Sequence, residues 1–165
     1  LVFLKSGKID FGVVSTPFSG EGVHSETVRE IEDIFVAGRQ FFQYKNKTLD
    51  LHDLENLPLI TLEKNTSTRS CMDSFLAENG VRINPEFELA TSDMIVQFAL
   101  RSLGIGNVVR DFAAEYLESG RLFELRFNKM IPRRHFCVVT GKGNLLSAAA
   151  RRLLELIQTE EYRKE

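Results

Sequence analysis

The sequence has 165 residues, of which 43% are hydrophobic and 27% are charged, and its formal net charge is -2. This length allows a buried core in one domain or in two small lobes, and the charge gives no indication of wholesale nucleic-acid binding by this segment. No stretch approaches the roughly 20 apolar residues that a membrane-spanning helix needs, and no positively charged and then apolar signal peptide opens the chain.

The cysteines and histidines form no recognisable motif. Cys71 and Cys137 are far apart and match no paired-ligand spacing, so no disulfide framework is expected. This cysteine content predicts a protein of the reducing cytoplasm. His24, His52 and His135 are scattered along the chain. Structural metal ligands usually cluster, so the sequence predicts neither a metal site nor a cofactor.

The first predicted element is the end of an amphipathic helix in "LVFLKSG", which Gly7 stops. Residues 9–14 are rich in β-branched side chains and predict a buried parallel strand, which leads into a polar loop containing Ser15 and Thr16. Because a domain rarely begins inside a helix, we expect a strand and most of a helix to precede Leu1.

Strands and helices then alternate to the end of the chain. Strands are predicted in "EDIFVAG", in residues 58–62, and in "EFELA", "IGNVV", "LFELRF" and "HFCVVT". Helices are predicted in "TSTRSCMDSFLAENG", "TSDMIVQFALRSLG", "DFAAEYLESG" and "SAAARRLLELIQTEEYRKE", and a helical turn begins at Asp50. Thr91 or Ser92, Asp111 and Ser147 are the expected N-caps. The alternation implies right-handed crossovers and a mainly parallel sheet, so the predicted class is α/β.

Enzyme motifs are not supported by their spacing. The "GIG" of residues 104–106 lies between a helix and a following strand, whereas a dinucleotide-binding fingerprint needs the reverse order. "TGKGN" is too short for a P-loop, and no nucleophile elbow of the G-x-S-x-G type occurs. Cys71 is expected to pack beside Met72 and Phe75. The sequence therefore predicts that the protein is not an enzyme.

Hydroxyl residues recur where predicted strands end. Ser15 and Thr16 follow the first strand, residues 66–68 follow the third, and Thr91 and Ser92 follow the fourth. Ligands of open α/β sheets bind outside the carboxyl ends of strands, where helix N-termini favour anions. These side chains predict a site for a small polar ligand, although Ser and Thr are also ordinary N-caps.

Together, these motifs resemble the effector-binding domain of LysR-type transcriptional regulators. "LKSGKIDFGVVSTP" is similar to that family's helix end, glycine, strand and polar loop, and "LDLHDLENLPLITLEKNTSTR" to its "l-x-DL-x-x-x-P-l-I" segment and the following loop. "SLGIGNVV", "YLESGRL" and "SAAARRLLELI" resemble its later glycine motifs and closing helix. The resemblance covers nearly the whole chain in order.

The resemblance implies two hinged Rossmann-like lobes of the periplasmic-binding-protein type (type 2). Lobe I would combine residues 1–36 with 137–165, and lobe II would span 37–136, with crossings at "DIFVA" and "HFCVV". The family's winged helix-turn-helix would lie upstream and is absent from this chain, as are its first strand and loop. Family inducers bind between the lobes.

The resemblance also carries residues into the ligand site. Ser15 and Thr16 correspond in lobe I, and Thr91 and the hinge residue Thr140 are weaker matches. The loop of lobe II contributes the residues Thr66, Ser67 and Thr68, and Arg69 would add a forked donor if it turned inward. Two departures stand out: Arg110 replaces the usual proline after the "GIG" strand, and Asn65 and Ser67 replace the usual loop glycines.

The predicted function is therefore that of a cytoplasmic sensor. A small inducer, anionic or carboxylated, would bias the arrangement of a homodimer or homotetramer and so control DNA binding and transcription. The apolar helix over residues 93–103 is a candidate for self-association, with a wide core contact as the equal alternative. The rival functions are an exported solute-binding protein and an α/β enzyme whose catalytic groups meet only in three dimensions.

Overall fold

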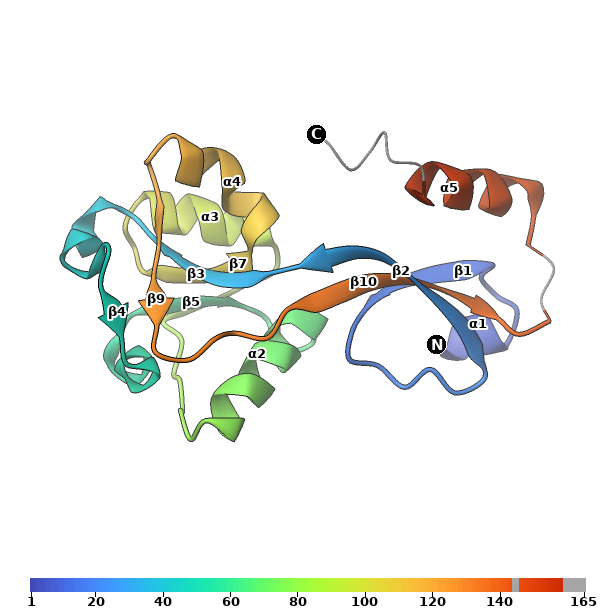
Figure 1. Cartoon of the computed structure of the whole chain (residues 1–165), viewed down its shortest axis with the longest axis horizontal. Helices are drawn as coiled ribbons and strands as arrows, with labels where there is room; N and C mark the ends of the chain where they lie inside the picture. Colours follow the sequence, from blue (N-terminus) through green and yellow to red (C-terminus); the bar gives the residue numbers. More distant parts are fainter. Residues whose placement is uncertain (144–145, 159–165) are drawn as a thin grey trace. The chain divides into compact units, whose positions relative to one another are not determined.

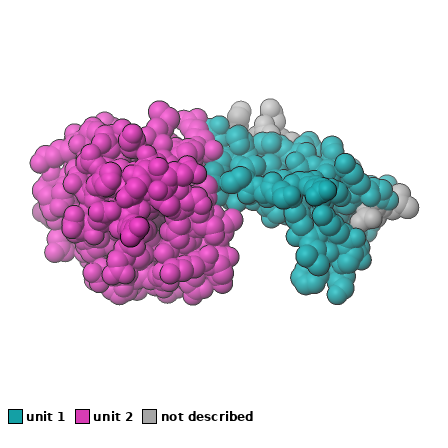
Figure 2. Space-filling view, turned by 90° about the horizontal axis from the view of Figure 1, so that it is seen from below, with its two compact units in different colours: residues 1–30, 134–165 teal, residues 31–133 magenta. Residues whose placement is uncertain are grey.

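The computed structural model describes residues 1–143 and 146–158. The chain divides into two compact units, one formed by residues 1–30 and 134–165 (unit 1) and one by residues 31–133 (unit 2), as coloured in Figure 2. Helices and strands alternate in both, so the predicted α/β class is confirmed. No helix in the described ranges is long and apolar enough to cross a membrane.

Unit 2 is built on a five-stranded sheet with the order β6-β5-β7-β3-β8. These strands are β3 (Asp33–Ala37), β5 (Leu59–Leu62), β6 (Phe87–Leu89), β7 (Ile105–Val109) and β8 (Phe123–Glu124). β5 runs parallel to both β6 and β7, whereas β3 runs antiparallel to β7 and β8. A separate parallel pair joins β4 (Thr48–Leu49) to β9 (Arg126–Phe127).

Helices cover both faces of this sheet (Figure 1). Alternate residues of β3 point to opposite faces, so Phe35 packs in one hydrophobic cluster and Ile34 in another. The first cluster includes α2 (Ser67–Glu78) and the short helices η1 (Arg39–Tyr44) and η2 (Leu51–Asn56), and the second includes α3 (Ser92–Leu100) and α4 (Arg110–Glu118). Unit 2 therefore has a two-sided core.

The turn predicted to begin at Asp50 is η2. The Asp50 carboxylate accepts a hydrogen bond from the backbone N–H of His52, and the Asp53 carboxylate accepts one from the backbone N–H of Asp50, which makes a capping box. Asn128 donates to the other oxygen of Asp50 at 2.8 Å. The hydrogen bonds from the His52 backbone and side chain, followed by that from Asn128, lower the pKa of Asp50.

Unit 1 contains a three-stranded sheet with the order β1-β10-β2. Its elements are α1 (Val2–Lys5), β1 (Phe11–Ser15), β2 (Val23–Ile31, which ends one residue inside unit 2), β10 (Arg134–Gly141) and α5 (Ala148–Gln158). One small hydrophobic cluster joins the three buried residues Leu4, Val23 and Val139. Ser147 caps α5 as predicted, accepting a hydrogen bond from the N–H of Ala150.

Several local predictions are wrong. The strand predicted over residues 9–14 is β1, which pairs antiparallel with β10 and is only partly buried, because it is an edge strand of the three-stranded sheet. Val109, with no side-chain hydrogen bond, is the N-cap of α4 instead of Asp111. The helix predicted to reach Leu103 ends at Leu100, since Ser102 adopts a positive φ of 58°. Strand β2 was not predicted; most of its side chains are exposed, and only Val23 and Ile31 at its two ends are buried.

Candidate ligand-binding site

The predicted site residues of unit 2 lie at one edge of its sheet. Because β5 and β6 are parallel neighbours, the loops that follow them leave the sheet at the same edge. Those loops begin α2 and α3, and Thr66 and Thr91 are the N-caps, accepting hydrogen bonds from the backbone N–H groups of Arg69 and Met94. The structure therefore brings Thr91 to the same edge as residues 66–68.

The hydroxyl of each N-cap threonine is hydrogen-bonded within the protein. The Thr66 hydroxyl accepts from Arg69 N–H at 3.2 Å and also donates to the carbonyl oxygen of Glu63 at 3.0 Å. Ser67 begins α2 and is exposed, and Thr68, in the first turn, is half-buried. The backbone N–H groups of this first helical turn still carry the partial positive charge of a helix N-terminus, which suits an anion.

Arg69 is buried and holds three elements together. Its Nη1 donates to the Thr61 hydroxyl at 2.8 Å, to the Leu62 carbonyl at 2.9 Å and to the Glu88 carboxylate at 2.9 Å, while its Nε donates to Asp73 at 2.8 Å. Burial lowers the pKa of Arg69, but the hydrogen bonds to Asp73 and Glu88 outweigh it, so the net pKa is raised. Nε and Nη1 both donate to groups of the protein, so Arg69 fixes the segment that carries Thr66.

A second arginine lies at the same edge, after β7. The Arg110 guanidinium donates to Glu32 at 2.5 Å and to Glu124 at 2.6 Å, and its backbone N–H donates to the Glu32 carbonyl. Burial lowers its pKa, and the hydrogen bonds to the two glutamates raise it above the ordinary value. The sequence marked Arg110 only as a departure from the family pattern, since its partners are remote in the chain.

In unit 1, Ser15 and Thr16 lie at the carboxyl end of β1. Thr16 forms a backbone hydrogen bond to His135 and accepts another at its hydroxyl from the His135 N–H. Ser15 pairs with Phe136 in the ladder, is 9% exposed, and its buried Oγ has no hydrogen-bond partner. Buried polar atoms are almost always hydrogen-bonded, so the Ser15 hydroxyl needs an explanation.

Thr140 is not brought together with these two residues. It pairs with Phe11 at the amino end of β1, four ladder positions from the pair of Ser15 with Phe136. At about 3.3 Å per residue this places Thr140 about 13 Å from Ser15 along the strand. Arg134, which sequence reasoning missed, is much nearer: it begins β10, is 2% exposed, and its Nη1 is the second buried atom without a hydrogen bond, although the residue makes other interactions.

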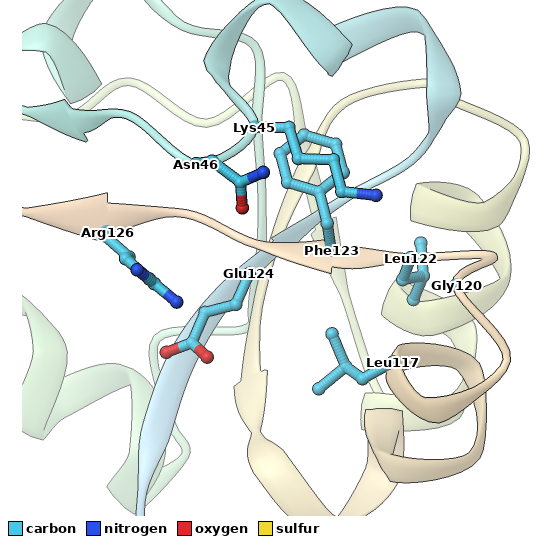
Figure 3. Close-up of a pocket in the computed structure, with 8 residues that line it drawn as sticks. All are labelled: Lys45, Asn46, Leu117, Gly120, Leu122, Phe123, Glu124 and Arg126. Carbon is cyan, nitrogen blue, oxygen red and sulfur yellow. The ribbon is translucent and has the colours of Figure 1, made fainter.

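A pocket of about 210 Å³ lies at the other edge of the sheet of unit 2, beyond the end of β3 (Figure 3). None of the predicted site residues lines it. Its walls combine exposed Lys45 and Arg126 with an apolar floor and with Glu124, whose carboxylate is bound by Arg110. A wider pocket of about 380 Å³ includes Glu32 and Glu124. Sequence spacing gave no signal for either, because their linings come from separate segments.

The chemistry available at the predicted residues is binding chemistry. Hydroxyl groups and helix N-termini donate hydrogen bonds to a polar or anionic ligand without supplying a nucleophile–base pair. Within residues 1–143 and 146–158, no group of three or more His, Cys, Asp or Glu side chains could hold a metal ion.

Comparison with known proteins shows the family of this chain. The family model described as "LysR substrate binding domain" matches residues 2–161. The chain is 29% identical over 125 residues to the HTH-type transcriptional activator CmpR of a Synechocystis strain, an alignment that covers 75% of this chain and 41% of CmpR. The chain spans about half the length, or less, of the first three curated relatives it matches.

Solved structures share the fold. The regulatory domain of Synechocystis PCC6803 CcmR, in complex with 2-PG, aligns with a TM-score of 0.81 and 17% identity, covering 95% of this chain and 76% of that one. The effector-binding domain of QuiR, in complex with shikimate, aligns with a TM-score of 0.78 and 16% identity, covering 99% and 77%. At these identities the likeness concerns the fold alone.

Proposed function

The chain belongs to the LysR substrate binding domain family, and we propose that it is the effector-sensing part of a bacterial transcriptional regulator. The observation that carries this proposal is the match of one family model to residues 2–161, nearly the whole chain. The name of CmpR, a transcriptional activator, supports it. We propose that DNA is bound by a winged helix-turn-helix outside this chain, since the segment itself has a net charge of only -2.

We propose that each unit contributes a ligand-binding loop. Unit 1 offers Ser15 and Thr16, and unit 2 offers residues 66–68 with Thr91, at the edge where β5 and β6 end. Arg69 lies in the first turn of α2 and holds that turn in place through its hydrogen bonds to Thr61 and Leu62. Thr140 is a weaker candidate, because it lies at the far end of β1 from Ser15.

The effector we propose is a small anionic or carboxylated molecule. Helix N-termini at Thr66 and Thr91 favour negative charge, and the hydroxyl loops offer donors. Two of the similar structures contain small polar ligands, 2-PG in CcmR and shikimate in QuiR. Binding would act by favouring one conformation over another, without catalysis, in a cytoplasmic protein.

Self-association as a dimer or tetramer is part of the proposal. Helix α3 buries Ile95, Val96 and Ala99 in unit 2 but leaves Met94 43% exposed. Phe87 on the neighbouring edge strand β6 is 38% exposed and packs edge to face against Phe98. This apolar surface is the proposed contact between copies, and a Met94→Glu variant sedimenting as a smaller species than the parent chain would support it.

The sensing function is tested by a ligand screen with the chain itself. A library of small metabolites, read out by thermal unfolding and by amide shifts in NMR spectra, should yield compounds that move the signals of residues 15–16 and 66–68. Ser15→Ala should weaken binding of a hit about tenfold, as expected for one lost hydrogen bond to a polar ligand. Ser74→Ala, one turn further along α2, is the control and should leave affinity unchanged. Hits that move only other regions would contradict the assigned loops.

A further inference from the structure

The edge strand β8 borders a pocket that none of the residues of the proposed effector site lines (Figure 3). All of its lining residues belong to unit 2, so the pocket is formed without any residue of unit 1. We propose that this pocket is a second ligand site, and that it takes a small monocarboxylate with an apolar body. The inference goes beyond the effector-sensing function and does not depend on it.

The outer edge of β8 supplies a backbone donor. β8 is the last strand of the five-stranded sheet and pairs with β3 on one side only. In this antiparallel pair the N–H of Leu125 donates to the Phe35 carbonyl at 2.9 Å, and the preceding residue Glu124 is opposed to Val36. Because such bonds alternate along an antiparallel pair, the N–H of Glu124 is directed away from β3. Glu124 lines the pocket, so this N–H can donate to a ligand there.

Two side-chain cations border the same pocket. Lys45 follows η1 and Arg126 lies in β9, and both side chains are exposed (Figure 3). The Lys45 ammonium lies 5.1 Å from the centre of the Phe42 ring. Neither cation forms an ion pair within residues 1–143 and 146–158. Cations that lack a carboxylate partner favour an anionic ligand, and an arginine can bind a carboxylate through two parallel hydrogen bonds.

The charge balance of the lining limits the charge of the ligand. Among the described lining residues Glu124 alone carries a carboxylate, and Arg110 Nη2 already donates to it at 2.6 Å. Lys45 and Arg126 against Glu124 leave one net positive charge. One negative charge on a ligand compensates this excess, whereas a second would be repelled by the Glu124 carboxylate. The pocket therefore favours a monoanion over a dianion.

Apolar side chains form the rest of the wall. Leu122 and Phe123 are buried, and Leu117 at the end of α4 is half-buried. An apolar body placed against these side chains is removed from water, which stabilises the complex. The pocket volume of about 210 Å³ is below the range of about 300–1,000 Å³ that is usual for drug-sized ligands, so the ligand has only a few carbon atoms.

The experiment is an amide NMR titration of the whole chain at pH 7.5 (about the pH where succinate is a dianion) and at constant ionic strength. The probe is 3-methylbutanoate, and the expected result is saturable movement of the signals of residues 45–46, 120–124 and 126. Three further compounds should each bind about fivefold more weakly or worse: the neutral amide 3-methylbutanamide, acetate without the apolar body, and succinate with a second charge.

The chain offers a matched control for the two cations. Lys45→Gln and Arg126→Gln should each weaken binding of 3-methylbutanoate about fivefold, since each removes one exposed charge contact. Lys47→Gln makes the same change of charge two residues from Lys45, at an exposed position that does not line the pocket, and should change the Kd by less than about twofold. Equal affinities of Lys45→Gln, Arg126→Gln and Lys47→Gln would overturn the site.

The unsubstituted chain also decides the ligand class. An amide that binds as tightly as the acid overturns the charge requirement, and acetate or succinate binding as tightly as 3-methylbutanoate overturns the proposed class. Movement of residues 15–16 and 66–68 reports the effector site separately. If the acid moves only those signals, the second site is wrong and the sensing function stands. If it moves only residues 45–46, 120–124 and 126, the second site is supported whatever the outcome of the effector screen.

Discussion

Unit 2 and unit 1 differ in how much apolar surface they bury and in how completely their polar side chains are hydrogen-bonded. Unit 2 buries a hydrophobic cluster on each face of a five-stranded sheet, whereas unit 1 buries one small cluster around Leu4 beside a three-stranded sheet. The polar residues differ in the same way. In unit 2 the Thr66 hydroxyl and the Arg69 guanidinium are hydrogen-bonded within the unit, whereas in unit 1 the Ser15 hydroxyl has no partner.

The difference teaches that a predicted site residue can be present for two reasons. Thr66 caps a helix, and this alone accounts for its identity, since an N-cap contributes about 1 kcal/mol without any ligand. Ser15 caps no helix, and its side-chain oxygen has no hydrogen-bond partner although its backbone is paired in the sheet of unit 1, so no local role of the hydroxyl accounts for its identity. Four experiments break or sharpen this comparison.

The largest effect is expected from separating the units. Residues 31–133 expressed alone should unfold cooperatively, because both clusters of unit 2 lie within this continuous segment. Residues 1–30 joined by a short glycine–serine linker to 134–165 should remain largely unfolded, because the apolar area they bury is small. Circular dichroism and amide NMR of the two chains test this. A folded second chain would remove the contrast between the units.

The core of unit 2 should be the most sensitive to single substitutions. Phe35 is 1% exposed and packs edge to face on Phe127, with ring centroids 5.5 Å apart. Phe35→Ala should lower the free energy of unfolding by about 3–5 kcal/mol, because it removes buried area and leaves a cavity. Phe112→Ala, at a position 48% exposed, is the control and should cost under about 1 kcal/mol. Chemical denaturation measures both, and equal losses would contradict the two-sided core.

Substitution of Arg69 should lower the free energy of unfolding by less, and should also change the order of a nearby segment. Arg69→Met keeps most of the side-chain volume but leaves the buried Thr61 hydroxyl and the Leu62 carbonyl without their charged donor. We expect a loss of about 2–3 kcal/mol in the free energy of unfolding, with broadened NMR signals in residues 66–68. Arg101→Met, on an exposed helix end, should cost about 0.5 kcal/mol or less. Unchanged signals in residues 66–68 would show that Arg69 does not orient the loop.

The smallest effect concerns acid. The hydrogen bonds from His52 and Asn128 hold the pKa of Asp50 below the ordinary value of 3.8. A carboxyl whose folded pKa is depressed contributes stability above its unfolded pKa, and this stability disappears as the pH falls through the folded pKa. The stability difference between the parent chain and Asp50→Ala should therefore shrink as the pH falls below about 4. A difference that grows in acid would contradict the direction of the shift.

Much of unit 2 could be predicted from local sequence, because its signals are local. The apolar run of β5, the hydroxyl cap and the helical spacing of Met72 and Phe75 in α2 lie within a few residues of one another. The same holds for the capping box at Asp50. Where a cap, an apolar face and a stop occur together, the element and its ends follow from the chain alone.

The rest depends on contacts between distant residues. β2 was missed because most of its side chains are exposed, so its sequence shows no alternation of apolar and polar residues. The strand forms by pairing with β10 in the three-stranded sheet. The internal role of Arg69 requires Glu88 on the next strand, and the burial of Ser15 requires its pairing with Phe136 on β10. Thr140 and Ser15 are both hydroxyl residues near strand ends, but they lie at opposite ends of the ladder between β1 and β10. Register of this kind is set by tertiary packing.

Arg110 binds carboxylates from two segments far apart in the chain, Glu32 before β3 and Glu124 in β8. A proline at position 110 would also remove the N–H that donates to the Glu32 carbonyl. Because all three side chains are about a third exposed, solvent screens the charges, and losing the arginine would cost less than losing a fully buried ion pair. One side chain therefore ties the start of β3 to the edge strand β8.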